Sequence, residues 1–483
     1  MQSDTETKPS SPEALQLAIS AVSRSQWISL IVAGIAGSFI VLSPTPEGLT
    51  RQAQLGLAIT AFTVVLWITR AVNNGIASVV MMALLVLAGV RPGLALSGFA
   101  TPGLWILLCA LFYGFAMERT GLAQRISYFI LSLFPATYLG ILSAFCCAGF
   151  LLALGIPSMT VRTAILVPIA WALVQSLDLE DRSRGNALII LTTIEMAVVP
   201  GLAFLYGSLM GPIVDDVFRA KQFPLSWLGY AQVLAPPTVV LCILIIFINR
   251  CVLRPEKPLK CDQSFVRNKL NSMGSIKASE WTTGAIVLAS ICFWATDRIH
   301  HLPSFLIGMF GLGVFAFSGI VRDKDIGSGI SWSLLLFIGG IFSLSNVVQE
   351  YRITDWLAGY LVPVVRSLTF STLLLLVVLV VATYLMRFID PSGLLAIPVL
   401  FLPIAEPLSA VGLRPLVIVA PLLMGSVPFW LNYQNIWVTM GDGMTDGRAF
   451  TGTQRLILAT VYAIATLIAM LIATVYWKAM GIL

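Results

Sequence analysis

Two short polar stretches interrupt long apolar regions of this 483-residue sequence. The first is GIPS at 155–158, with Thr160 and Arg162 shortly after it. The second is DPSG at 390–393, which begins with Asp390. A guanidinium group can hold an oxyanion by two parallel hydrogen bonds, and the N-terminus of a helix that starts at such a break favours anions. These residues therefore indicate non-covalent binding of a small anion.

Each stretch also carries signals for the start of a helix inside the apolar region. Ser158 and Thr160 can cap a new helix, because their hydroxyl oxygens accept hydrogen bonds from N–H groups of the first turn. Asp390 followed by a proline is typical of a helix N-terminus. We therefore expect both helices to begin within the membrane.

Each half of the sequence has a second break downstream. Pro200-Gly201 interrupts a later apolar segment, and Glu195 lies five residues before the proline. In the other half Pro428 interrupts a segment and is followed by three amide side chains, Asn432, Gln434 and Asn435. Carbonyl groups freed at such breaks can coordinate an ion or a substrate.

The composition is that of an integral membrane protein. Hydrophobic residues make up 58% of the chain and charged residues 11%, whereas soluble domains have about 45–50% and about 25%. The net charge of +6 is attributed to cytoplasmic loops and not to a nucleic-acid partner. The sequence contains no HExxH, GxSxG or GxxxxGK[ST] motif, so neither an enzyme nor a pump driven by ATP is expected.

The apolar segments predict an all-α polytopic membrane protein. About eleven segments are long enough to cross a bilayer, which takes roughly 20 residues of helix. Regions 138–176 and 369–407 are too long for one helix, and each is interrupted near its centre. We expect each of these regions to form a re-entrant hairpin of two half-length arms.

One polar loop divides the chain into two membrane halves. The expected parts are a tail at 1–26, a first half at 27–249, the loop at 250–280 and a second half at 281–483. The loop carries seven basic and three acidic residues, and the positive-inside rule places it in the cytoplasm. Counting spans from the loop puts the N-terminus in the cytoplasm and the C-terminus outside.

The two halves contain similar segments at a nearly constant offset. AMERTGLAQRI at 116–126 resembles VVQEYRITDWL at 347–357, and AILVPIA at 164–170 resembles LLAIPVL at 394–400. The breaks VVPG and SVPF form a third pair. These pairs predict two inverted repeats, the architecture of many secondary transporters.

The stretch SMTVRTAILVPIA at 158–170 resembles the hairpin motif of the divalent-anion/sodium symporter family, the carriers of dicarboxylates, citrate and sulfate. That motif reads Ser-Asn-Thr and ends in Leu-Pro-Ile. The resemblance covers nearly the whole membrane region. It implies that Ser158 and Thr160 occupy the motif's Ser and Thr, and that Gly201 lies near a glycine whose carbonyl helps to bind sodium. It also implies a homodimer and elevator-type movement.

The sequence departs from this family pattern at several positions. Met159 replaces the motif's Asn, Arg162 stands where a small residue is usual, and the second motif reads FID at 388–390. These departures argue against coupling to two sodium ions. Arg162 has four alternative roles: an ion pair with Asp390 or Glu195, contact with the anion, replacement of a sodium ion, or a cytoplasm-facing position with no role. By the repeat offset we expect Asp390 near Arg162, carrying a proton in one state and pairing in another.

The sequence thus predicts a secondary transporter of small anions, of the di- or tricarboxylate or sulfate class, in the inner membrane of the cell. The coupling is left open between sodium, protons and exchange. No other cofactor or metal is expected, and the expected partners are the anion, membrane lipid and a second copy. An anion channel and an arsenite-type carrier are the alternatives. The predicted substrate-binding residues are Ser158, Met159, Thr160, Arg162, Asp390, Ser392, Asn432 and Asn435. The predicted coupling-ion residues are Ser158, Gly201, Glu195 and Asp390.

Overall fold

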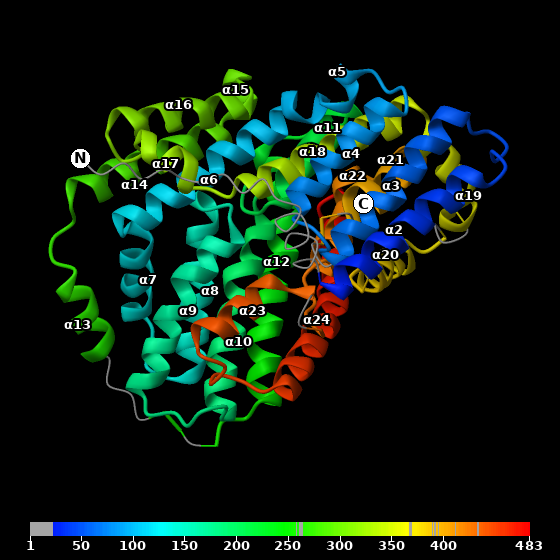
Figure 1. The fold of residues 1–483 in the computed structure, drawn as a ribbon. Helices are drawn as coiled ribbons and strands as arrows, with labels where there is room; N and C mark the ends of the chain where they lie inside the picture. Colours follow the sequence, from blue (N-terminus) through cyan, green and yellow to red (C-terminus); the bar gives the residue numbers. More distant parts are fainter. Residues whose placement is uncertain are drawn as a thin grey trace. The chain divides into compact units, whose positions relative to one another are not determined.

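All elements of the described chain are helices (Figure 1). The chain forms two compact units, Met1–Gly98 with Leu336–Ile353 and Phe99–Leu335 with Thr354–Leu483. The computed structural model describes residues 23–483 except 257, 260–263, 367–369, 389, 391–392, 395, 411 and 432–433.

The smaller unit contains the first helices of the chain and most of α18. Its elements are α2 (Arg24–Leu42), α3 (Arg51–Thr69), α4 (Asn74–Leu87), α5 (Pro92–Ala95), the 3-10 turn η1 (Ser97–Ala100) and the C-terminal part of α18 (Trp332–Glu350). Trp67 of α3 packs edge-on against Phe337 of α18, with ring centroids 5.1 Å apart. Asn346 of α18 donates a hydrogen bond of 2.8 Å to Ser97. These contacts join the two sequence segments of this unit.

The larger unit contains both hairpin regions. Its helices before residue 335 are α6 (Pro102–Thr120), α7 (Leu122–Leu133), α8 (Tyr138–Gly155), α9 (Met159–Ser176), α10 (Arg184–Val198), η2 (Val199–Ala203), α11 (Met210–Ala220), α12 (Trp227–Val252), α13 (Ser264–Ser272), α14 (Ala278–Ala295), α15 (Asp297–His300), α16 (Ser304–Phe317) and α17 (Asp323–Ser328). The later elements are α19 (Ile353–Arg366), α20 (Thr372–Met386), the π-helical η3 (Ile397–Phe401), α21 (Leu402–Ala410), α22 (Pro415–Gly425), α23 (Ile436–Met444) and α24 (Gly452–Ala479).

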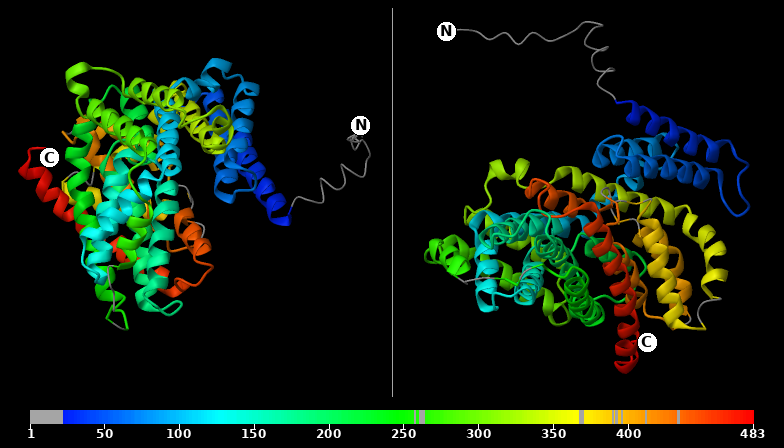
Figure 2. Two further views of the ribbon diagram at one scale, coloured as in Figure 1. Left: turned by 90° about the vertical axis from the view of Figure 1, so that its left-hand side faces the viewer. Right: turned by 90° about the horizontal axis from the view of Figure 1, so that it is seen from below.

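Helices α8, α9, α10 and α12 form the centre of this unit (Figure 1). A β-carbon at Gly149 of α8 would overlap with the carbonyl oxygen of Met196, so α8 and α10 are in close backbone contact. The long α24 packs along α12 (Figure 2), where Trp477 donates a hydrogen bond of 3.0 Å to the carbonyl of Val233. The site described below is built around this packed centre.

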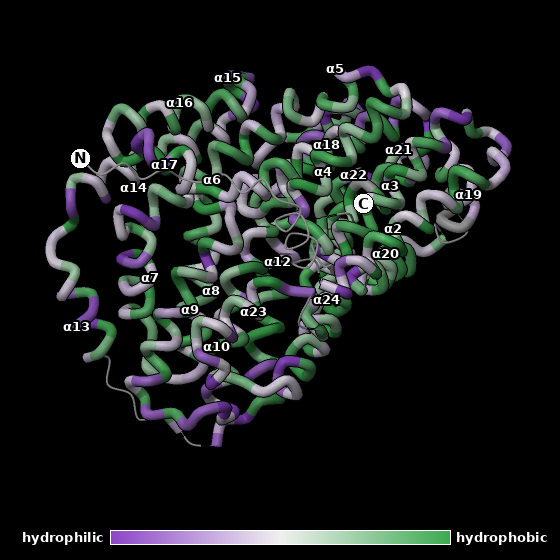
Figure 3. The backbone as a smooth tube through the Cα atoms, viewed as in Figure 1, coloured by the Kyte–Doolittle hydropathy of each residue, from purple (hydrophilic) through white to green (hydrophobic). Residues whose placement is uncertain are grey.

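Nine helices in the described part of the chain are long and apolar enough to cross a membrane, and five shorter apolar helices add to them. Figure 3 shows hydrophobic residues along these helices and hydrophilic residues in the turn between α9 and α10. The expected total of about eleven spans stays a prediction.

The first hairpin has the expected limits but longer arms. Helices α8 and α9 occupy Tyr138–Gly155 and Met159–Ser176, and the GIPS stretch separates them. Each arm has 18 residues, about 27 Å at 1.5 Å per residue, which is close to the thickness of the hydrocarbon core. The expectation of half-length arms was therefore wrong for this region, because its 39 residues suffice for two helices of nearly full length.

The second hairpin region breaks where expected, after α20 ends at Met386. The backbone N–H of Asp390 donates to the carbonyl of Met386, the last residue of α20, at 2.7 Å. The prediction that Asp390 caps a following helix concerns Pro391 and Ser392 and stays a prediction. Ser392 lies outside the described residues, as does the proline that precedes it.

The two downstream breaks are also present. The 3-10 turn η2 follows α10 directly, and α11 begins only at Met210. In the second half α22 ends at Gly425 and α23 begins at Ile436. The polar loop at 250–280 contains the short helix α13.

Candidate functional site

The N-terminus of α9 is capped as the sequence predicts. Ser158 is the N-cap, and its hydroxyl accepts a hydrogen bond of 3.3 Å from the N–H of Val161. Met159 is buried, whereas Thr160 is exposed. The thioether at 159 therefore fills the interior, and Thr160 offers the accessible hydroxyl of this turn.

Arg162 lies one turn further along α9 and its side chain is fully buried. Its guanidinium donates hydrogen bonds to four backbone carbonyl oxygens. The partners are Ile156 at 2.5 Å, Ala197 at 2.6 Å, Gly207 at 2.7 Å and Val198 at 3.4 Å. The guanidinium thus joins the hairpin break to both sides of the break at η2.

This arrangement corrects the expected pairing of Arg162. Within the described residues, Arg162 forms no ion pair with Asp390 or Glu195; its partners are the four carbonyl oxygens. Breaks in a helix leave carbonyl groups without their usual donors. Several such dipoles together can compensate one positive charge, and the fork of a guanidinium suits them because it has five N–H donors.

Gly201 lies directly against this guanidinium. A β-carbon at Gly201 would overlap with the guanidinium of Arg162 and with the carbonyl oxygen of Gly207. Glycine at this position therefore permits the close approach of η2 to Arg162. The role of Gly201 in binding a coupling ion stays a prediction.

Glu195 lies in a different environment, between α10 and α12. Its Oε2 accepts a hydrogen bond of 2.7 Å from Asn249 Nδ2, which also donates to Thr192 Oγ1 at 3.0 Å. Its Oε1 is buried and has no hydrogen-bond partner in the part of the chain that the structure describes. The carboxyl group is thus held by one amide, that of Asn249.

A second buried arginine occupies the break in the other half. Arg387 donates to the carbonyl oxygen of Asp390 at 2.7 Å and also to the carbonyl of Gln434. Both Arg387 and Asp390 are buried. Arg387 thus binds main-chain carbonyls as Arg162 does, a contact that the sequence did not predict. The sequence feature that could have indicated this role is a charged residue at the end of an apolar segment.

The amide of Asn435 organises the start of α23. Its Oδ1 accepts hydrogen bonds from the N–H groups of Trp437 at 3.0 Å and Val438 at 3.2 Å. Its Nδ2 donates to the carbonyl of Val427 at 3.1 Å. Asn435 is therefore a helix cap that also fixes the preceding break, while Asn432 lies outside the described residues.

The starts of α9 and α23 lie side by side. Trp437 Nε1 donates a hydrogen bond of 3.3 Å to Thr160 Oγ1, and helices α9 and α23 pack against each other. The side chain of Trp437 is buried at this junction. Two helix N-termini, one from each half, thus present partial positive charge at one place, and this favours an anion.

Comparisons with known proteins agree with this chemistry. Residues 24–483 match the family described as "Sodium:sulfate symporter transmembrane region". The chain is 25% identical over 396 residues to "Dicarboxylate transporter 1, chloroplastic" of Spinacia oleracea, which covers 80% of this chain and 69% of that protein. It is 23% identical over 435 residues to a sodium-dependent dicarboxylate transporter of Staphylococcus saprophyticus, covering 83% and 82%. The solved YdaH transporter of Alcanivorax borkumensis has the same fold, with a TM-score of 0.52 at 15% identity over 97% of this chain and 99% of that one.

Proposed function

Because the chain belongs to the sodium:sulfate symporter family, we propose that it carries small dicarboxylates across the membrane by secondary transport. The family and the apolar helices make it a multi-pass membrane protein that transports a small anion, and not an enzyme. The relatives named dicarboxylate transporters support the choice of substrate class. Sulfate is the alternative anion, and the inner membrane is the proposed location.

One observation supports this function most directly: the N-termini of α9 and α23 meet through the hydrogen bond from Trp437 to Thr160. An anion at this junction is stabilised by two helix dipoles, each worth about 0.3–1 kcal/mol or more when partly buried. The hydroxyl of Thr160 can donate to a carboxylate while its oxygen accepts from the indole. Binding that uses dipoles and neutral donors leaves the anion free to depart, as a carrier requires.

The contacts of Arg162 are the basis for our proposal about the coupling ion. Carbonyl oxygens gathered at helix breaks are the groups that coordinate coupling cations in transporters with broken helices. Here the Arg162 guanidinium occupies that cluster. We therefore propose that transport needs no sodium ion at the first break, and that exchange or proton coupling drives it instead. The proposal also includes a homodimer and an elevator-type movement, both of which the family resemblance implies.

Uptake into liposomes tests this function. Purified full-length protein would be reconstituted, and entry of labelled succinate and sulfate measured with a sodium gradient, with a proton gradient, or with unlabelled dicarboxylate inside. We expect saturable succinate uptake that internal dicarboxylate stimulates and that sodium leaves unchanged. Uptake that requires sodium would contradict the coupling, and uptake that does not saturate would favour a channel.

A matched pair of tryptophan variants tests the site. Trp437→Phe removes the donor to Thr160, and loss of a hydrogen bond worth about 1 kcal/mol corresponds to about fivefold weaker binding. Trp430→Phe removes an indole that donates to Thr460 Oγ1 at the same distance of 3.3 Å. We expect the KM for succinate to rise only in Trp437→Phe. Equal effects of both variants would contradict the assignment of this site.

A further inference from the structure

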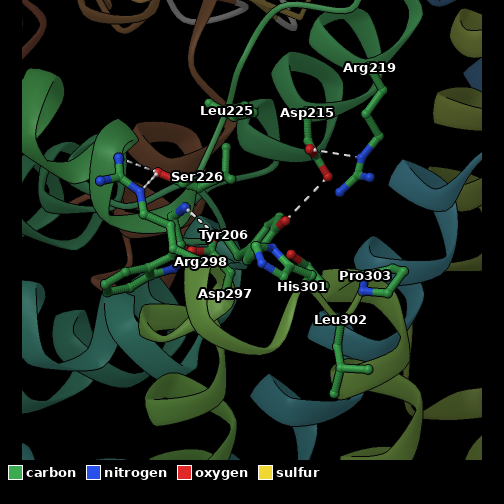
Figure 4. Close-up of a pocket in the computed structure, with 13 residues that line it drawn as sticks. Tyr206, Asp215, Arg219, Leu225, Ser226, Asp297, Arg298, His301, Leu302 and Pro303 are labelled. Atoms are coloured by element: carbon green, nitrogen blue, oxygen red, sulfur yellow. Dashed lines mark hydrogen bonds and ion pairs between the residues drawn. The ribbon is translucent and has the colours of Figure 1, made fainter.

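A charged pocket and an apolar groove adjoin each other in the larger unit. The pocket has a volume of about 300 Å³ and lies at the ends of α11, α12, α15 and α16 (Figure 4). The groove has a volume of about 440 Å³ and lies between α14 and α16. Leu302 lines both. A ligand with a polar end and an apolar end would fit the two cavities together.

The pocket contains one charged group of each sign with unused hydrogen-bonding capacity. Asp297 Oδ2 accepts from the N–H of Trp227 at 2.8 Å, while its Oδ1 is buried and has no partner in the described chain. Arg298 donates from Nε and Nη2 to Ser226 Oγ at 3.1 and 3.0 Å. Ser226 is neutral, so the guanidinium charge has no anion among the described residues.

The remaining charges of the pocket are already paired. Arg219 Nε donates to Asp215 Oδ1 at 3.0 Å, and Tyr206 donates to Asp215 Oδ2 at 3.2 Å. Figure 4 shows this group on the opposite side of the pocket from Arg298. A ligand therefore meets one acceptor on Asp297 and one cation on Arg298, which are neighbours in the sequence.

The groove continues from this pocket along two helices. Its walls on α14 include Ala285, Ala289 and Phe293, which lie four residues apart on one face, and those on α16 include Phe310 and Val314. The span from 285 to 293 is about 12 Å at 1.5 Å per residue. The hydroxyl of Ser290 is already bonded to Tyr113 and to the carbonyl of Ile286, so the groove offers no free polar group at that point.

We propose that the pocket and groove bind one phospholipid with an ethanolamine headgroup. Its phosphate meets the free N–H groups of Arg298, because a guanidinium has five donors and Ser226 uses two of them. Its ammonium group donates to Asp297 Oδ1, the acceptor without a partner. One acyl chain lies in the groove between α14 and α16. The site therefore distinguishes lipids by their cationic group and not by net charge alone.

Competition between three lipids tests this site. Full-length protein would be incubated with equal amounts of dioleoyl phosphatidylethanolamine, phosphatidylcholine and phosphatidylglycerol, and retained lipid counted by native mass spectrometry. We expect at least fivefold preference for ethanolamine. Choline has no N–H to donate, and glycerol donates without a charge, so both leave Asp297 poorly compensated.

Two headgroup variants and two groove variants complete the test. Asp297→Asn keeps the acceptor for Trp227 and should abolish the preference, while Arg298→Ala should reduce retention of all three lipids. Ala289→Trp should block the acyl chain, whereas Leu288→Trp, exposed on the same helix outside the groove, should not. The proposal would be overturned by equal retention of the three lipids. It would also be overturned if Ala289→Trp changed only the fraction of dimer, since a second copy would then cover the groove.

Discussion

Buried arginines are the distinctive residues of this protein. Arg162 and Arg387 each place a guanidinium among main-chain carbonyls at a helix break. A buried charge without partners is costly, and so is a buried carbonyl without a donor, at about 1–3 kcal/mol each. Each arginine removes both costs at once. We therefore expect these residues to stabilise the broken segments on which the proposed site depends.

Replacement of Arg162 by alanine should strongly destabilise the protein. It would leave four carbonyl oxygens without donors, a loss of the order of 3–5 kcal/mol by analogy with broken buried pairs. Because the vacated cluster then suits an inorganic cation, sodium in place of potassium should restore part of the lost thermal stability. Thermal unfolding in detergent measures both effects. Arg254→Ala, at an exposed position, is the control. An unchanged melting temperature in Arg162→Ala would refute the structural role of the guanidinium.

Glu195 is expected to tolerate glutamine better than alanine. Its Oε1 and Asn249 Oδ1 are both buried acceptors without a partner in the described chain. The amide of Gln can supply a donor, so Glu195→Gln should keep or raise the melting temperature. Glu195→Ala should cost about 2 kcal/mol. Thermal unfolding measures the stability of both variants. Uptake measures the coupling: if Glu195→Gln still transports the anion but no longer responds to a proton gradient, Glu195 carries the coupling proton.

At the scale of elements, α11 should make stability depend on pH. Burial, together with the neighbouring carboxylate of Asp215, raises the pKa of Asp216 to about 7, compared with about 3.9 in an unfolded chain. The folded state therefore binds more protons between these values, and its stability falls as the pH rises from about 4 to about 7, by up to about 1.4 kcal/mol for each pH unit.

Asp216→Asn should remove most of this dependence. The unfolding midpoint would be followed from pH 5 to pH 8, and we expect a flatter profile in the variant with a gain of stability at pH 8. Asp323→Asn changes an exposed carboxylate and should leave the profile as in the wild type. Parallel profiles of wild type and Asp216→Asn would show that another group is responsible.

Two helical glycines with different surroundings provide a matched pair of variants that test the contact between α8 and α10. A β-carbon at Gly149 would overlap with the carbonyl of Met196, whereas nothing lies within 4 Å of one at Gly313. Gly149→Ala should therefore separate α8 from α10 and lower the melting temperature. Gly313→Ala should be neutral or stabilise α16 by roughly 0.5–1 kcal/mol, since alanine favours helices. Equal effects on thermal unfolding would mean that α8 and α10 are not in close contact.

At the scale of the whole molecule, the proposed site depends on contacts between distant parts of the sequence. Trp437 donates to Thr160, and Ser426 donates to the sulfur of Met210 at 3.3 Å. Both contacts join the two predicted repeats within the larger unit. In the proposed function an anion at this junction would contact both halves, and its binding would bias a movement that involves them together.

The spans counted from the basic loop place the two ends of the chain on opposite sides of the membrane. Alkaline phosphatase fused after Leu483 should be active outside the cytoplasm, and green fluorescent protein fused there should be dark. The same reporters fused after Arg254, in the basic loop, should give the reverse result. A fluorescent C-terminal fusion would exclude the predicted orientation.

The sequence by itself determined the class of the protein and the positions of both hairpin breaks, while anion binding at 158–162 stays a prediction. These features are local: apolar length, proline and glycine positions, and capping residues act on neighbouring backbone. The tertiary structure decided that Arg162 binds the carbonyls of Ala197 and Gly207 and that Trp437 reaches Thr160. These contacts join segments up to 277 residues apart, and a buried charge takes whichever dipoles the packing places around it. Which groups compensate Arg162 therefore followed from the packing of the helices and not from the spacing of its charged neighbours.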